Sequence, residues 1–157
     1  MQYCTFYLDN KHFGIPMLDV QEVMLQQVLS PVPLASSVVR GLMNLRGNIV
    51  LSIDMRRRLG LPETATEQES IQIITQGPSG LVGWMVDQMG EVAELDPALG
   101  EIPPGTVAAA SRELMTSVFQ LETGLLMVLD GERILEMEQE CNEIPREIAR
   151  EGARELV

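Results

Sequence analysis

The residues able to perform nucleophilic or acid–base chemistry are few and scattered. His12 is the only histidine, and the two cysteines, Cys4 and Cys141, lie near opposite ends of the chain without a CxxC spacing. A catalytic triad or dyad needs a nucleophile and an orienting acid beside the histidine. The residues around His12 form no recognisable motif of that kind. We therefore expect His12 to occupy a surface position in a strand.

Metal and nucleotide sites also lack their usual signatures. Zinc takes three or four Cys, His or carboxylate ligands, and one histidine with two distant cysteines is not a convincing set. The sequence contains no GxGxxG, GxxxxGK[ST] or HExxH pattern. We expect no catalytic residues, no metal and no cofactor, as is typical of a binding module.

The charged residues support the same interpretation. Asp19, Glu22, Asp87 and Glu91 could form a carboxylate pair, but no accompanying signature marks a site, and we interpret all four as solvated. The one basic cluster, residues 56–58, is three arginines followed by acidic sequence. We interpret it as a solvated helix face rather than a phosphate site.

The composition of the chain excludes some classes of binding partner. A net charge of −12 and a pI near 4.4 oppose binding to nucleic acids or to anionic membranes. No apolar run reaches the roughly 20 residues that a spanning helix needs, so we expect no direct membrane insertion. The free thiols, with no signal peptide before them, indicate the reducing cytoplasm. Ten methionines suggest adaptable contact surfaces.

The elements that must position these residues are mostly short strands. Three hairpins are predicted around turn-forming residues: 2–8 with 12–15, 71–75 with 81–85, and 117–121 with 125–129. Segment 42–53 contains two further extended stretches that meet at residues 46–48, a turn that Gly47 permits. Segment 28–34 is extended because of its two prolines, and 62–70 and 97–110 are predicted loops.

Helices are expected to be few and short. Apolar residues predict a helical turn or two over 17–24, and segment 35–40 is predicted as a short helix that Gly41 ends. Asp54 is placed to cap a helix over 55–59. In the tail from residue 131, apolar residues follow a 3-4-3-4 spacing that predicts an amphipathic helix, kinked at Pro145. The tail either packs on the body of the protein or offers a seam to a partner helix.

Many short strands with turns about every ten residues predict an all-β barrel or sandwich. The helices are too few to cover a parallel sheet. A faint repeat supports two similar halves, each contributing an apolar face: residues 14–23 and 83–92 both run from Gly to Glu-Val over ten positions.

Three sequence blocks, in this order and spacing, resemble the CheW family of chemotaxis coupling proteins. The first is FGIP at 13–16 followed by VQEV at 20–23. The second is PVP at 31–33 leading to GLMNLRGNIV at 41–50 and IDMR at 53–56, and the third is GWMVDQMGEV at 83–92. The resemblance covers nearly all of residues 2–136, and the NLRG motif at 44–47 is its most recognisable part.

The resemblance implies two five-stranded, SH3-like barrels around a shared hydrophobic core. We expect the CheW-like domain to span residues 1–136, with a charged, helical tail over 137–157. The implied function is a non-catalytic adaptor, cytoplasmic and recruited to receptor arrays. It would bridge the cytoplasmic helical hairpin of a chemoreceptor and the homologous regulatory domain of a CheA-type histidine kinase.

The resemblance also implies a receptor-binding groove between the two barrels. Matching positions in this chain are Cys4, Met17, Val20, Met85 and Met89, with Glu22, Gly41, Arg46 and Val92 nearby. Such a trough, rich in methionine, would suit an amphipathic helix; the alternative is that its apolar members all belong to the core. Kinase contacts are expected on loops at the barrel ends, without assignment to residues.

Arg46 has two interpretations. Beside a permissive glycine, its guanidinium can project and bind a carboxylate with two hydrogen bonds, or it can serve as an internal brace. Departures from the family pattern at Leu51, Ser52 and residues 130–134 leave the pathway open, so an adaptor of a non-flagellar, chemotaxis-like system is an alternative. A sensor of apolar small molecules is a rival from another class, and a hydrolase using carboxylates a weaker one.

Overall fold

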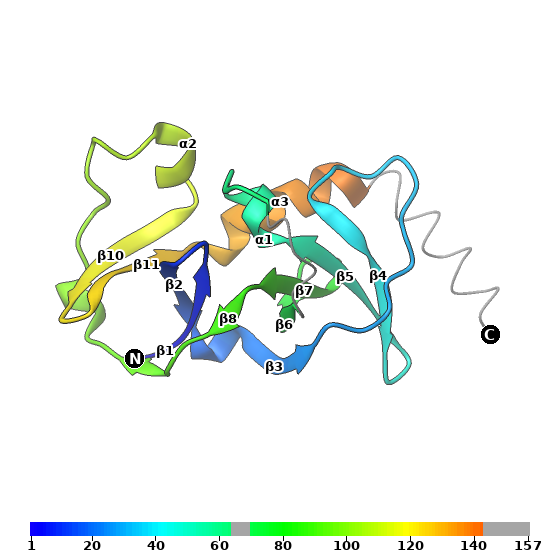
Figure 1. Ribbon diagram of the computed structural model, residues 1–157, viewed down its shortest axis with the longest axis horizontal. Coiled ribbons are helices and arrows are strands. Elements are labelled where there is room, and N and C mark those ends of the chain that lie inside the picture. Colours follow the sequence, from blue (N-terminus) through cyan, green and yellow to red (C-terminus); the bar gives the residue numbers. More distant parts are fainter. Residues whose placement is uncertain (64–69, 143–157) are drawn as a thin grey trace.

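The computed structural model describes residues 1–63 and 70–142, which form two mixed β-sheets lying side by side (Figure 1). The first sheet has the strand order β10-β11-β2-β1-β8, with β9 also paired to β1. Its strands are β1 (Gln2–Leu8), β2 (Lys11–Pro16), β8 (Gln88–Met89), β9 (Ala93–Glu94), β10 (Met115–Leu121) and β11 (Gly124–Leu129). Strands β8 and β9 pair with opposite halves of β1, so this six-stranded sheet is five strands wide.

The second sheet has five strands in the order β3-β6-β7-β5-β4. They are β3 (Val20–Leu25), β4 (Val39–Leu45), β5 (Asn48–Asp54), β6 (Ile71–Gly77) and β7 (Gly80–Val86). The helical elements are short except the last: η1 (Met17–Asp19), α1 (Met55–Arg58), η2 (Pro97–Leu99), α2 (Ala109–Arg112) and α3 (Gly131–Asn142). The predicted all-β class is confirmed, as are all three hairpins and the 46–48 turn. No helix in the described ranges is long and apolar enough to cross a membrane.

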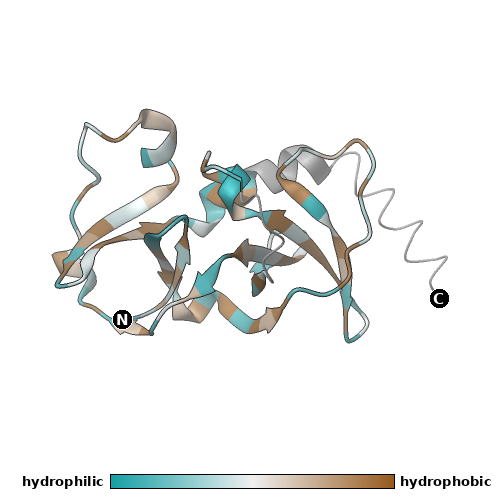
Figure 2. Cartoon of the chain, viewed as in Figure 1, coloured by the Kyte–Doolittle hydropathy of each residue, from teal (hydrophilic) through white to brown (hydrophobic). Residues whose placement is uncertain are grey.

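A single core joins the two sheets. Its central cluster takes Phe6 and Phe13 from the first sheet, Ile73 and Trp84 from the second, and Ile134 from α3, all buried. Smaller clusters fill the outer part of each sheet. Figure 2 shows apolar strands at the centre of the molecule. The core shared between two halves is therefore present as predicted.

The chain passes between the sheets twice. It leaves the first sheet after β2 and enters the second through η1, and it returns between β7 and β8 (Figure 1). The ten-residue repeat predicted to mark two similar halves, 14–23 and 83–92, covers both passages. We call these two segments the crossings.

Two helix predictions were wrong. Only one 3-10 turn forms at Met17–Asp19, and the rest of 17–24 is strand β3, paired antiparallel with β6. Along β3, half-buried and exposed residues alternate, and positions 20 and 24 fit both a helical and a strand period. The segment 35–40 forms no helix: the Ser36 hydroxyl accepts a hydrogen bond from the amide of Val38, a local turn that competes with helix formation.

Other local predictions are confirmed. Asp54 caps α1, its side chain accepting from the amide of Arg57 at 3.2 Å. Segment 28–34 is a connector, as predicted, and touches β4 through a bridge between Ser30 and Leu42, but it is not extended throughout, because residues 33–34 form a turn in which Leu34 has φ +61°. Helix α3 begins at Gly131 as expected, whereas Pro145 and the predicted loop residues 64–69 lie outside the described residues. The domain boundary at residue 136 stays a prediction.

A buried polar contact inside the second sheet explains the glycine that opens the third family block. The hydroxyl of Ser52 donates to Oε1 of Gln72 at 2.8 Å, and both side chains are fully buried. A Cβ on Gly83 would lie 2.0 Å from the same Gln72 oxygen. An alanine at position 83 would have to displace a buried amide from its hydrogen bond.

We predict that Gly83→Ala lowers the free energy of unfolding by about 2 kcal/mol, through overpacking and loss of the Ser52–Gln72 hydrogen bond. Urea denaturation measures the change. Gly105→Ala is the matched control, since a Cβ there meets nothing within 4 Å. Equal stability of the two variants would contradict this explanation of Gly83.

Candidate functional site

The residues considered for catalysis do not assemble a reactive centre. His12, in β2, is half-buried, and its ring stacks on Tyr7 with centroids 4.6 Å apart. Burial lowers the pKa of His12 and raises the pKa of the Cys4 thiol, so both groups are held in their neutral forms. Within residues 1–63 and 70–142, no group of three or more His, Cys, Asp or Glu side chains is placed to hold a metal ion.

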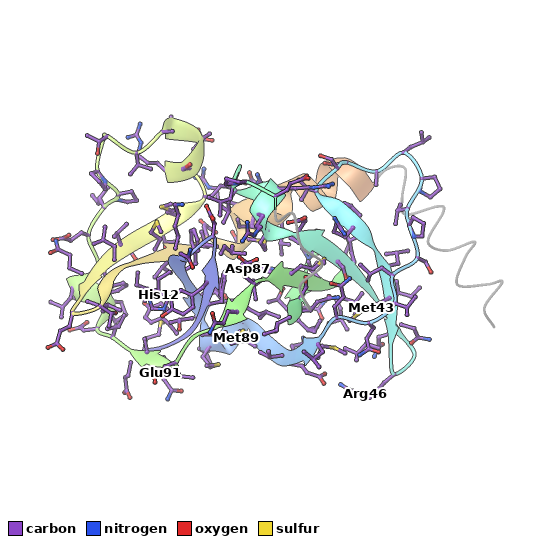
Figure 3. The ribbon with its side chains drawn as sticks, viewed as in Figure 1. His12, Met43, Arg46, Asp87, Met89 and Glu91 are labelled. Carbon is purple, nitrogen blue, oxygen red and sulfur yellow. The ribbon has the colours of Figure 1, made fainter. Side chains whose placement is uncertain are left out.

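Three of the predicted receptor-binding residues lie on the two crossings. Met17 lies in η1, Val20 begins β3, and Met89 lies in β8 opposite Phe6. All three are half-buried and pack against the central core cluster, which leaves part of each side chain accessible. We refer to the accessible parts of Met17, Val20 and Met89 together as the junction surface. Figure 3 shows Met89 between the two sheets.

Other members of the predicted set differ in exposure. Cys4 and Met85 are buried, Cys4 in the central core and Met85 in β7 between β5 and β6. Any effect of these two side chains on a partner would act through packing. Val92, just after β8, is 55% exposed. Of the six apolar residues predicted to bind a receptor, Cys4 and Met85 are therefore buried, and the other four are at least partly exposed to solvent.

Glu22 and Arg46 are brought together by the barrel closure. Glu22 is in β3 and Arg46 is in the β4–β5 turn, and β3 and β4 are the two edge strands of the second sheet. Nη1 of Arg46 donates to one carboxylate oxygen at 3.2 Å, and Nη2 pairs with the other. This bidentate contact lowers the pKa of Glu22. The Arg46 side chain remains 71% exposed, so it links the two edges while facing solvent.

Gly41 has a structural reason for its residue type. It lies at a bulge in β4, with φ +151°, and an added Cβ would lie 2.6 Å from the carbonyl oxygen of Ser30. Glycine allows the 28–30 connector to pass this close to the strand. A larger residue at position 41 would therefore displace the 28–30 connector, and any effect on a partner would follow from that displacement.

The arginine cluster at 56–58 is not the solvated helix face that the sequence suggested. Nε of Arg56 donates to both carboxylate oxygens of Asp87, at 2.9 and 3.0 Å, and Nη1 donates to the carbonyl of Pro62 at 2.7 Å. Asp87 also accepts the amide of Asp9 at 2.9 Å. Because Asp87 and Glu22 are both half-buried and each is paired with an arginine, the assignment of these two carboxylates as solvated was also wrong.

This contact fixes the return crossing. Arg56 belongs to α1 of the second sheet, Asp87 lies between β7 and β8, and Asp9 is in the β1–β2 turn of the first sheet. Although α1 is strongly hydrophilic, it sits at the junction of the two sheets (Figure 2). Burial alone would raise the pKa of Asp87, but hydrogen bonds from Arg56 and from the Asp9 amide outweigh it and hold the pKa below its usual value.

The other two arginines extend the same link. Arg57 pairs with Glu63 at 2.8 Å and donates to the carbonyl of Ser37 at 2.8 Å. Arg58 donates to the carbonyls of Arg133 and Ile134 in α3, at 2.9 and 3.1 Å. Three consecutive side chains thus tie α1 to the return crossing, to the loops at Ser37 and Glu63, and to α3. No local pattern in the sequence signals these distant partners.

The fold defines a protein built from two β-barrels that share one core. The family model for the CheW-like domain matches residues 2–139. The chain belongs to the CheW-like family. It is 28% identical over 141 residues to the chemotaxis protein CheW of Bacillus subtilis, covering 90% of each chain. It is 27% identical over 133 residues to the CheW of Treponema pallidum, covering 82% of this chain and 78% of that one.

The fold is also that of a solved family member. The crystal structure of the scaffolding protein CheW from Thermoanaerobacter tengcongensis aligns with a TM-score of 0.77 and 23% identity, covering 85% of this chain and 86% of that one. The chain therefore has the CheW fold, built here from one six-stranded and one five-stranded mixed sheet.

We predict that Asp87→Asn lowers the free energy of unfolding at pH 7 by about 1–2 kcal/mol. This is less than the loss expected for a fully buried ion pair, because 23% of the Asp87 side chain is exposed and solvent screens its charge. The pKa of the Asp87 carboxyl is lower in the folded than in the unfolded protein. Its charge therefore stabilises the fold at pH values above the unfolded-state pKa, and this stabilisation is lost as the pH falls through the folded-state pKa. The difference between wild type and variant should therefore shrink between about pH 5 and pH 2.

Urea unfolding at a series of pH values measures this difference, with Glu91→Gln, an exposed carboxyl near the same crossing, as the control. A difference that stays constant down to pH 2 would assign the effect of Asp87→Asn to packing instead of charge.

Proposed function

We propose that this protein is a chemotaxis adaptor without enzymatic activity, coupling chemoreceptors to a CheA-type histidine kinase in the cytoplasm. The match to the CheW-like domain along residues 2–139 is the observation that carries the proposal. The relatives named chemotaxis protein CheW span nearly the same length. A fold that combines two barrels and no assembled reactive centre among the described residues suits a scaffold.

The junction surface is the proposed receptor site. Its exposed parts are apolar and flexible, which suits the apolar face of a helix from a receptor hairpin. Val92 follows Met89 by three residues and is exposed, as is the guanidinium of Arg46, and Figure 3 places Met89 between Glu91 and Arg46 in this view. Gly41, Cys4 and Met85 contribute to this site by holding the backbone and core beneath it.

The regulatory domain of the kinase is proposed to dock at the barrel ends. Each end presents large exposed apolar side chains on loops or hairpins, and such patches mark interaction sites. At the first sheet these are Leu99, Ile102 and Leu125, and at the second sheet Leu25, Val28 and Leu34. The two patches lie at opposite ends of the molecule (Figure 1). Both are separate from the junction surface.

The departures from the family pattern at Leu51 and Ser52 do not favour another pathway. Both residues are buried in β5, and the Ser52 hydroxyl serves the hydrogen bond to Gln72 inside the second sheet. Both side chains pack inside the second sheet and are not exposed to a partner. They are explained by core packing alone.

The test compares alanine truncations of exposed residues against both partners. Arg46→Ala should weaken binding of a receptor hairpin fragment about tenfold, and Ile102→Ala and Val28→Ala should each weaken binding of the kinase regulatory domain by a similar factor. Each variant should bind the other partner as wild type does. Isothermal titration calorimetry measures both affinities, and thermal melts should be nearly unchanged because all three side chains are exposed.

A large drop in the melting temperature of Arg46→Ala would make Arg46 a brace through Glu22. Wild-type protein that binds neither fragment would contradict the adaptor function itself. Wild-type kinase affinity in both Ile102→Ala and Val28→Ala would overturn the assignment of the barrel ends.

A further inference from the structure

A cavity of about 840 Å³ lies where η1, the β6–β7 turn and the start of α3 meet. Its apolar wall includes Ile15, Leu129 and Leu135, one from each of β2, β11 and α3. Leu18 and Asp19 of η1 line it, whereas Met17 and Val20 of the junction surface do not. The cavity is therefore separate from the proposed receptor site, although both use the first crossing.

Two buried polar groups in the cavity wall have no hydrogen-bond partner. Thr75 in β6 is 3% exposed and Trp84 in β7 is 1% exposed, and both line the cavity. Within the described part of the chain, neither Oγ1 of Thr75 nor Nε1 of Trp84 has a partner. The indole edge beside Nε1 faces Gly131, another lining residue, since a Cβ there would lie 3.9 Å from Cζ2 of Trp84. A buried donor without an acceptor is costly, so this wall favours an occupant that carries an oxygen atom.

The rim of the cavity is acidic. Asp19 and the α3 residues Glu132 and Glu136 line it, and no lysine or arginine does. Asp130 also lines the cavity, but its side chain already accepts from the amides of Glu132 and Arg133 at the start of α3. Asp19, Glu132 and Glu136 are exposed, so water and salt screen them in part, but three carboxylates at one rim still attract a cation and oppose an anion.

We propose that this cavity is a binding site for a small organic cation whose apolar body carries a hydroxyl or carbonyl oxygen. The oxygen pairs with Nε1 of Trp84 and the hydroxyl of Thr75, the body lies against Ile15, Leu129 and Leu135, and the ammonium lies among the rim carboxylates. The size suits such a ligand, since small-molecule sites occupy about 300–1,000 Å³. Both polar wall atoms are shielded from solvent in the free protein, so the ligand must press the wall aside to reach them.

Trp84 is the only tryptophan, so one indole ¹H–¹⁵N resonance reports on the site. Three probes share a phenol body and differ in charge: tyramine, 4-ethylphenol and 3-(4-hydroxyphenyl)propanoate. Tyramine should shift the Trp84 resonance saturably, with a Kd on the order of 1 mM for a ligand of this size. The neutral phenol should bind about fivefold more weakly, and the anion should give no saturable shift.

Two variants separate binding from folding. Thr75→Val removes an unpartnered hydroxyl at nearly constant volume, so its melting temperature should stay equal or rise while tyramine affinity falls about fivefold. The triple variant Asp19→Asn, Glu132→Gln, Glu136→Gln should bind tyramine and 4-ethylphenol equally. The proposal is overturned if tyramine gives no saturable shift, if the anion binds as well as the cation, or if Thr75→Val binds tyramine like wild type.

Discussion

The ion pair between Arg56 and Asp87, extended to the amide of Asp9, is the contact on which the arrangement of the two barrels depends. It holds the return crossing at the point where the chain leaves the second sheet and pairs with β1 of the first. Since Met89 follows Asp87 by two residues, the same contact sets the position of one member of the junction surface. A polar link at this junction is partly buried and fully paired, which favours one geometry of the two barrels over others.

The two crossings explain why one core can serve two barrels. The second sheet, β3 to β7, is one continuous stretch of chain, whereas the first sheet combines β1 and β2 with β8 to β11, so both crossings lie where the chain leaves and re-enters the first sheet. In the first crossing, Met17 and Val20 pack against the core as part of the junction surface, whereas Leu18 and Asp19 line the cavity. A ligand in the cavity and a helix on the junction surface would therefore contact the same 3-10 turn. The barrel ends, by contrast, have their exposed apolar residues on loops and hairpins away from the crossings.

Much of the fold could be predicted because turn chemistry is local. Glycine and proline mark the hairpin ends whatever lies across the sheet, and the family blocks supplied the pairing of the two barrels. Segment 17–24 was misjudged because Val20 and Met24 fit two periods, and only pairing with β6 decides between them. The role of Arg56 could not be predicted, because its carboxylate partner Asp87 lies 31 residues along the chain and no local spacing links them. For the same reason the cavity, which joins residues from β2, β6, β7 and α3, left no sequence signal.

Amide hydrogen exchange with a receptor helical hairpin fragment tests the central claim most directly, since it reports on every backbone segment of the unmodified protein. The account predicts slower exchange over residues 17–24 and 88–92, within and beside the two crossings, with no change over 97–102 or 26–34 at the barrel ends. Protection confined to the barrel ends, with the crossings exchanging as in the free protein, would contradict it.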